Sequence, residues 1–322
     1  MIKRISIILL LSCIGYSAWC WGFYAHSKVN TYAVYLLPPE MMVFYKKNIL
    51  FLSAHATDAD KRRSKIPSEG AKHYIDIDRY GAYPYEALPR RWEDAVSKYS
   101  HDSIIANGIV PWNILSVLNR LTAAFKEKDF TKILKTSADI GHYIADAHVP
   151  LHTNSNHNGQ LTGQKGIHAF WESRIPELLA DKEFDFFIGK AQYISNPADY
   201  IWHRILESGI AADSVLQIEK QLSAEYPADK KYAFEQRGKL LLKQYSEGYT
   251  VEYNRRLNGM VARRMRQAIF SISSFWYTAW VNAGQPDLES LLIKRFTPAE
   301  LKQLNDLQRS WKSGKLVSRD EE

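Results

Sequence analysis

Apolar residues recur at spacings of three and four along most of the chain, the pattern of amphipathic helices. The spacing is clearest over residues 112–125, and it predicts a second helix from Phe130 until Pro150, because proline cannot continue a helix. Few segments alternate cleanly between apolar and polar positions. The pattern therefore predicts an all-α fold, a single multi-helical domain, with further helices over residues 26–37, 167–179, 198–222 and 240–281.

The pattern weakens towards the C-terminus. After Gln285 the chain becomes more charged, although Thr297 followed three residues later by Glu300 is a typical helix start. We expect the main domain to cover residues 21–285. Residues 286–322 then form a charged, helical C-terminal appendage, either a solvated tail or a docking element.

The N-terminus has the pattern of a signal peptide. Lys3 and Arg4 precede an apolar run over residues 5–14, which is too short to span a bilayer. Ala18 and Cys20 are small residues suited to a cut before Trp21. We expect residues 1–20 to be removed and the protein to be exported, periplasmic or secreted; an uncleaved membrane anchor is the alternative.

Composition adds two constraints. With 46% hydrophobic and 24% charged residues, the 322-residue chain resembles an ordinary soluble protein, and its net charge of +7 favours anionic partners. Its only cysteines, Cys13 and Cys20, lie in the expected signal peptide. The mature chain would thus have no disulfide and no thiolate to offer a metal.

Histidines and carboxylates supply the candidate chemistry. His142 and Asp146 are four residues apart on a predicted helix, so both side chains lie on one face and can bind one cation. His168 and Glu172 repeat this spacing, and His152 lies between the two pairs. Nitrogen and oxygen ligands of this kind suit zinc when thiolates are absent. Either pair alone could be an ordinary hydrogen-bonded pair on a helix surface.

The N-terminal part of the chain adds further candidates. His73 follows Asp58 by 15 residues. After cleavage, the free amino group and carbonyl of Trp21 could chelate a metal together with His26.

In order and spacing, these pieces resemble the signature of one superfamily, the bacterial zinc-dependent phospholipases C and the plant and fungal type I single-strand nucleases. The resemblance runs from Trp21 to Glu172, and it implies three zinc ions. The first would be held by Asp58, His73, His142 and Asp146, and the second by His152, His168 and Glu172. The third would be held by Trp21, His26 and a bridging Asp146. His148 is left out, because the family usually has another residue there.

The resemblance further implies a zinc-dependent phosphodiester hydrolase that uses a metal-activated water. Asp58 is the expected catalytic carboxylate, with Asp60 as its alternative. Basic residues after Asp58 could bind a phosphate, with a solvated basic turn as the alternative. The candidates for substrate binding are Lys61, Arg62, Arg63, Tyr74, Asp76 and Asn154.

The type of phosphodiester stays open. Glu172 and the short stretch between His152 and His168 favour a phospholipase C, whose substrate has a phospholipid headgroup. The early position of His26 favours a nuclease acting on single-stranded nucleic acid. A non-catalytic, zinc-binding exported protein is the remaining alternative. No stable protein partner and no transmembrane segment in the mature chain are expected.

Overall fold

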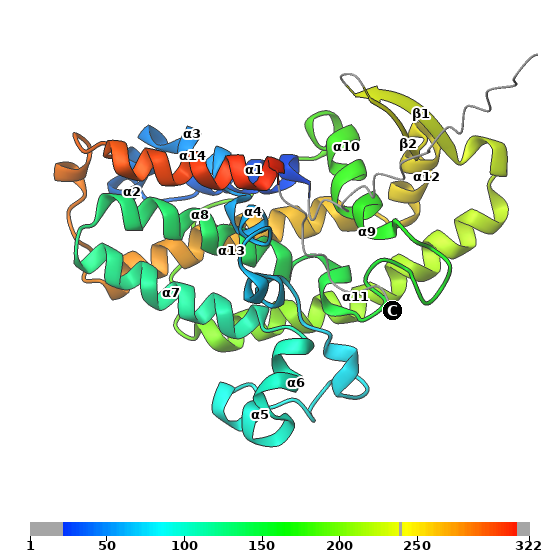
Figure 1. The fold of residues 1–322 in the computed structure, drawn as a ribbon, viewed down its shortest axis with the longest axis horizontal. Helices are drawn as coiled ribbons and strands as arrows, with labels where there is room; N and C mark the ends of the chain where they lie inside the picture. Colours follow the sequence, from blue (N-terminus) through cyan, green and yellow to red (C-terminus); the bar gives the residue numbers. More distant parts are fainter. Residues whose placement is uncertain (1–21, 238–239, 314–322) are drawn as a thin grey trace, which may run out of the picture.

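The two helices predicted most clearly from the sequence pack side by side at the centre of the computed structural model, which describes residues 22–237 and 240–313 (Figure 1). They are α7 (Val110–Lys126) and α8 (Phe130–Ala147). A tight turn joins them, and the Asp129 side chain caps α8 by accepting a hydrogen bond from the Lys132 amide at 2.9 Å. The prediction of a mostly helical single domain is confirmed.

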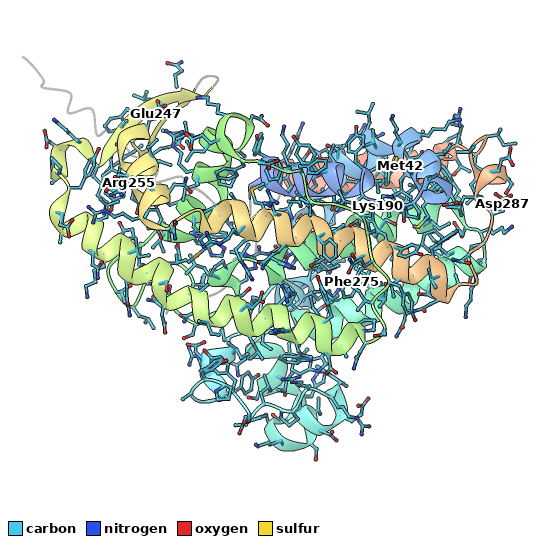
Figure 2. The ribbon with its side chains drawn as sticks, turned by 180° about the vertical axis from the view of Figure 1, so that it is seen from behind. Met42, Lys190, Glu247, Arg255, Phe275 and Asp287 are labelled. Atoms are coloured by element: carbon cyan, nitrogen blue, oxygen red, sulfur yellow. The ribbon has the colours of Figure 1, made fainter. Side chains whose placement is uncertain are left out.

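Three further long helices surround this pair. The N-terminal helix α1 (Phe23–Val34) and the long helix α13 (Met260–Asn282) both pack on α8 and on each other. The longest helix, α11 (Pro197–Glu225), contacts α7 and the turn after α8. Seen from behind, α11 and α13 cross the back of the molecule, with Phe275 on α13 (Figure 2).

Shorter elements complete the fold. The other α-helices are α2 (Pro39–Lys47), α3 (Ile49–Ala54), α4 (Asp58–Arg62), α5 (Trp92–Tyr99), α6 (His101–Ala106), α9 (Ile167–Ala169), α10 (Ile175–Glu183), α12 (Glu247–Arg256) and α14 (Pro298–Ser313). Short 3₁₀ turns are η1 (Pro67–His73), η2 (Ile77–Tyr80), η3 (Pro150–Thr153), η5 (Ala228–Lys230) and η6 (Glu289–Leu291). Between α9 and α10, η4 (Phe170–Arg174) is one turn of π-helix.

One predicted helix is partly wrong. Residues 240–281 begin with a strand, not a helix: β1 (Tyr232–Arg237) and β2 (Leu240–Tyr245) form an antiparallel hairpin (Figure 1). The leucine run in β2 gives no helical periodicity to distinguish a strand from a helix. It forms a strand because its backbone pairs with β1 in an antiparallel ladder.

The core is rich in aromatic side chains that find polar partners. Trp276 on α13 is fully buried, and its indole N–H donates to the carbonyl of Ser137 on α8 at 3.0 Å. The hydroxyl of the same serine lies 2.8 Å from that of Tyr45. Within the described residues, no helix has the length and apolar character needed to cross a membrane.

The C-terminal helix lies against the main body. Thr297 and Glu300 form the predicted capping box, in which each residue bonds to the other's backbone amide. The helix α14 packs on α4, and the Trp311 ring lies 5.0 Å from that of Phe23 on α1. Residues 298–313 are therefore a docked helix and not a solvated tail.

A glycine allows α1 to approach α8. A Cβ at Gly141 would lie 2.0 Å from Oδ1 of Asn30, which is fully buried on α1. The Asn30 amide bonds to the carbonyls of Leu52 and Ala138, so its side chain is held in place. Any side chain at position 141 would push the two helices apart.

We predict that Gly141→Ala destabilises the protein by about 1–3 kcal/mol, because the added methyl group overpacks the α1–α8 contact. Thermal or denaturant unfolding measures the change. Gly70→Ala is the control, since a Cβ there meets nothing within 4 Å. Equal stability of the two variants would show that the contact is not tight.

Candidate metal centre

Helix α8 supplies the two side chains at the middle of the site. His142 and Asp146 are both fully buried, and His142 Nε2 lies 3.3 Å from Asp146 Oδ2. The other ring nitrogen of His142 donates to the carbonyl of Ala56 at 2.8 Å. This bond orients the ring and leaves Nε2 available as a ligand atom, as in many metal-bound histidines.

Two residues from other segments converge on the same point. His73, at the end of η1, places Nδ1 at 2.9 Å from Asp146 Oδ2 and 3.0 Å from His142 Nε2. From α4, Asp60 Oδ1 lies 3.7 Å from each of these two histidine nitrogens. Asp60, His73 and His142 thus form a first set whose ligand atoms all lie within 4.8 Å of one another.

A second set lies beyond Asp146. Glu172 Oε2 is 3.0 Å from His168 Nε2 and 3.3 Å from His152 Nε2. His152 Nδ1 donates to the carbonyl of His73 at 2.6 Å, and the amide of Ile75 returns a bond to the carbonyl of His152. These backbone bonds join the second set to the first.

The π-helical turn η4 carries Glu172 of the second set. The wider turn holds Phe170, Trp171 and Glu172 in the buried interior, directly after the short helix that bears His168. Such turns often occur at functional sites. The periodicity of apolar residues in the sequence does not predict this π-helical turn.

The third set combines α1 with α8. The His26 ring stacks on that of His142, with centroids 3.9 Å apart, and its Nε2 lies 3.4 Å from Asp146 Oδ1. His26, His142 and Asp146 could hold one ion. Trp21, the other expected ligand here, lies outside the described residues.

The buried carboxylates of these sets fit a cation. Both oxygens of Asp60, Oδ1 of Asp146 and Oε1 of Glu172 are buried and have no hydrogen-bond partner within the described residues. A buried carboxylate oxygen without a partner is costly unless a cation is nearby. Several buried groups of histidine and carboxylate side chains in this protein could therefore hold metal ions.

Burial and mutual charge shape the protonation of the metal-free site. Burial opposes a charge on His142, but Asp146 and Asp60 outweigh it and raise its pKa to about 9. Burial raises the pKa of Glu172 to about 8, although His152 acts in the opposite direction. Burial and the neighbouring His142 lower the pKa of His26 to about 4.

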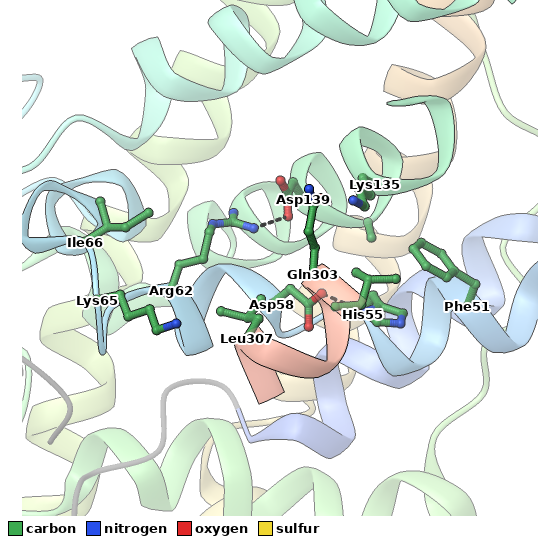
Figure 3. Close-up of a pocket in the computed structure, with 12 residues that line it drawn as sticks. Phe51, His55, Asp58, Arg62, Lys65, Ile66, Lys135, Asp139, Gln303 and Leu307 are labelled. Atoms are coloured by element: carbon green, nitrogen blue, oxygen red, sulfur yellow. Dashed lines mark hydrogen bonds and ion pairs between the residues drawn. The ribbon is translucent and has the colours of Figure 1, made fainter. Parts of the chain in front are cut away.

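The structure corrects the role expected for Asp58. Its Oδ2 accepts a hydrogen bond from His55 Nδ1 at 2.6 Å, and its Oδ1 one from Lys61 Nζ at 2.8 Å. Asp58 and Asp60 are two residues apart on α4, and residues at this spacing point to different sides of a helix. Asp60 joins the first metal set, whereas Asp58 lines a cavity of about 320 Å³ beside α14 (Figure 3).

The candidates for substrate binding lie outside the three sets. Lys61 is paired with Asp58, and the Tyr74 hydroxyl donates to the carbonyl of Ala106. Asn154 Oδ1 accepts from the amide of Asn156, and the Asp76 carboxylate is buried. The structure assigns none of these four residues to a substrate, and their binding role stays a prediction.

Arg62, a candidate phosphate ligand, instead links the segments that carry the first set. Its guanidinium donates to Asp139 on α8 (Figure 3). It also donates to the Tyr143 hydroxyl on α8 and to Glu69 on η1. Arg62 itself belongs to α4, so it connects the segments that bear Asp60, His73 and His142. The basic residues after Asp58 suggested a phosphate-binding role from the sequence. They did not indicate that Arg62 links these three segments.

His148, which the resemblance leaves out of the ligand set, lies outside the three sets found among the described residues. It is buried, and its Nδ1 donates to the carbonyl of Ile144 while Nε2 lies 3.1 Å from the Ser271 hydroxyl. Burial and the nearby Arg264 hold its pKa well below the usual range. It belongs to the packing between α8 and α13.

Comparison of the chain with protein-family models and with curated proteins finds no match in either set. The superfamily resemblance therefore rests on the motif and its spacing alone.

We predict that Asp60→Asn lowers zinc affinity by at least about 100-fold, because it removes a ligand charge from the first set. Asp58→Asn should keep the zinc content of the unaltered protein and lose only stability, since it leaves Lys61 without its buried partner. Elemental analysis after dialysis measures bound zinc. Loss of zinc in Asp58→Asn alone would restore the assignment made from sequence.

We also predict that zinc binding releases protons near pH 7. In the metal-free site His142 and Glu172 are protonated there, with pKa values of about 9 and 8, and both must lose a proton to become ligands. Zinc affinity should therefore rise as the pH increases towards 9. Titration calorimetry in two buffers of different ionisation enthalpy measures the released protons, and a heat independent of the buffer would contradict this.

Proposed function

We propose that this protein is an exported zinc-dependent phosphodiester hydrolase of the phospholipase C type. One observation carries the proposal: the first and third ligand sets share His142, and backbone hydrogen bonds join the second set to the first. His142 belongs to two sets, and Asp146 directs one oxygen towards His26 and the other towards His73 and His142. A structural zinc site is usually single and closed.

The donor set favours zinc. All ligand atoms are imidazole nitrogens or carboxylate oxygens, which zinc accepts in tetrahedral sites. Zinc ions held by these residues would lower the pKa of a bound water and would supply positive charge for a phosphoryl group. The chain's own contribution is to hold these ligands in fixed orientations, through bonds such as those from His142 to Ala56 and from His152 to His73.

Burial supports one direction of substrate approach. The side chains of His26, His142, Asp146 and Glu172 are inaccessible to solvent, whereas that of His168 is 13% exposed. The His157 ring lies 5.8 Å from that of His168, at the edge of the polar loop over residues 153–166. We place the entry of the phosphodiester on this side, where the loop can contact the groups attached to the phosphate.

The experiment is a paired assay of the purified protein on phosphatidylcholine and on single-stranded DNA and RNA, with and without chelator. We expect chelator-sensitive release of phosphocholine. Asp146→Asn should abolish it, with a loss of at least about 1,000-fold, because this carboxylate belongs to the third set and its other oxygen lies against His73 and His142 of the first. His203→Asn, which alters an exposed histidine outside the three sets, is the control.

The other outcomes distinguish the alternatives. Release of nucleotides without phosphocholine would identify a nuclease. Tightly bound zinc without activity on either substrate would favour the non-catalytic protein. Absence of bound zinc would overturn the proposal.

A further inference from the structure

The hairpin β1–β2 projects from the body beside α10 and α12 (Figure 1). Its register pairs Phe234 with Lys243 and Gln236 with Leu241, so these four side chains share one face. Phe234 is 70% exposed and Leu241 64% exposed. Two large apolar side chains thus face solvent on one side of a sheet that has no third strand within the described residues.

Charge is distributed unequally between the two faces. The one acidic residue of the two strands, Glu235, points to the opposite face and is bound by Arg174. The outward face carries Lys243, whose amine lies 4.2 Å from the centre of the Tyr232 ring. The outward face therefore combines apolar, aromatic and cationic side chains.

The base of the hairpin is attached to the candidate metal centre. Arg174 donates to Glu235 and to the carbonyl of Tyr245, and the Tyr245 ring stacks on Phe170 with centroids 3.8 Å apart. Phe170 and Arg174 are the two ends of the π-helical turn that carries Glu172. A surface bound to the hairpin would be held at a fixed position relative to the second ligand set.

We propose that the outward face of this hairpin docks on an anionic phospholipid bilayer, through Phe234, Leu241 and Lys243. Apolar side chains of this kind insert at the boundary between headgroups and acyl chains, tyrosine suits the same depth, and lysine attracts anionic headgroups. The rings of Phe234 and Tyr232 suit either a bilayer or a nucleic-acid base, but exposed Leu241 adds apolar surface that a bilayer buries and base stacking does not, and this favours a bilayer over a single strand. The proposal rests on the proposed function, since it supplies the surface from which a phospholipid substrate would come.

The test is flotation of the purified protein with vesicles of phosphatidylcholine mixed with phosphatidylglycerol, and with vesicles of pure phosphatidylcholine. We expect binding to the mixed vesicles that weakens at high salt. Phe234→Ser with Leu241→Ser should weaken it by at least about tenfold, because two apolar groups no longer leave water. Lys243→Glu should weaken binding to the mixed vesicles only.

The matched control is Leu50→Ser with Ile293→Ser, which removes two still more exposed apolar side chains, 83% and 81%, outside the hairpin. This control should bind vesicles as the unaltered protein does. Circular dichroism checks that each variant is folded, and hydrolysis of a soluble phosphodiester should be unchanged in the hairpin variant.

Binding is measured with and without chelator, so the two proposals can fail separately. Vesicle binding without hydrolysis would support the docking surface but overturn the proposed function. Hydrolysis of soluble substrate without vesicle binding, or equal binding by the hairpin variant, would overturn the docking surface. The unaltered protein could instead fail to bind vesicles but bind single-stranded DNA or form a dimer. If the hairpin variant then lost that DNA binding or that dimer, the face would be assigned to nucleic acid or to a second copy of the chain.

Discussion

The fold depends on a carboxylate that water cannot reach. Asp146 is fully buried, and its two oxygens lie close to histidines from three segments distant in the sequence: His26, His73 and His142. A buried charge is tolerated only when opposite charges or hydrogen-bond donors surround it. Helix α1, the end of η1 and helix α8 each contribute one of these histidines. All three segments must therefore be in place for the Asp146 charge to be compensated. A cation shared by these groups would relieve the mutual repulsion of the buried carboxylates.

Other contacts hold these segments at the distances that the cluster needs. Gly141 allows α1 to approach α8 closely enough for His26 to stack on His142. Arg62 ties α4, η1 and α8 through one guanidinium, whose charge-assisted hydrogen bonds reach Glu69 and Asp139. The backbone bonds between residues 73–75 and His152 extend the same framework to the second ligand set.

The second ligand set is linked in turn to the surface of the molecule. The π-helical turn presents Glu172 to His152 and His168 on its inner side, while Arg174 at its end binds the base of the hairpin. A single local distortion of the helix therefore serves both the buried centre and an exposed face. This arrangement links the candidate metal centre to the proposed docking face.

The sequence by itself determined the helical class, the main helices and most of the ligand candidates, because helical periodicity and i, i+4 spacing are local properties. His142 with Asp146 and His168 with Glu172 needed only the geometry of one helix. Only the tertiary structure decided between Asp58 and Asp60, since both lie near His73 in sequence and the packing of α4 selects which one turns inward. The role of Arg62 and the docking of α14 likewise depend on partners far along the chain, and the strand at residues 240–245 depends on pairing with β1. Such contacts leave no periodic signal, because they are made between segments and not within them.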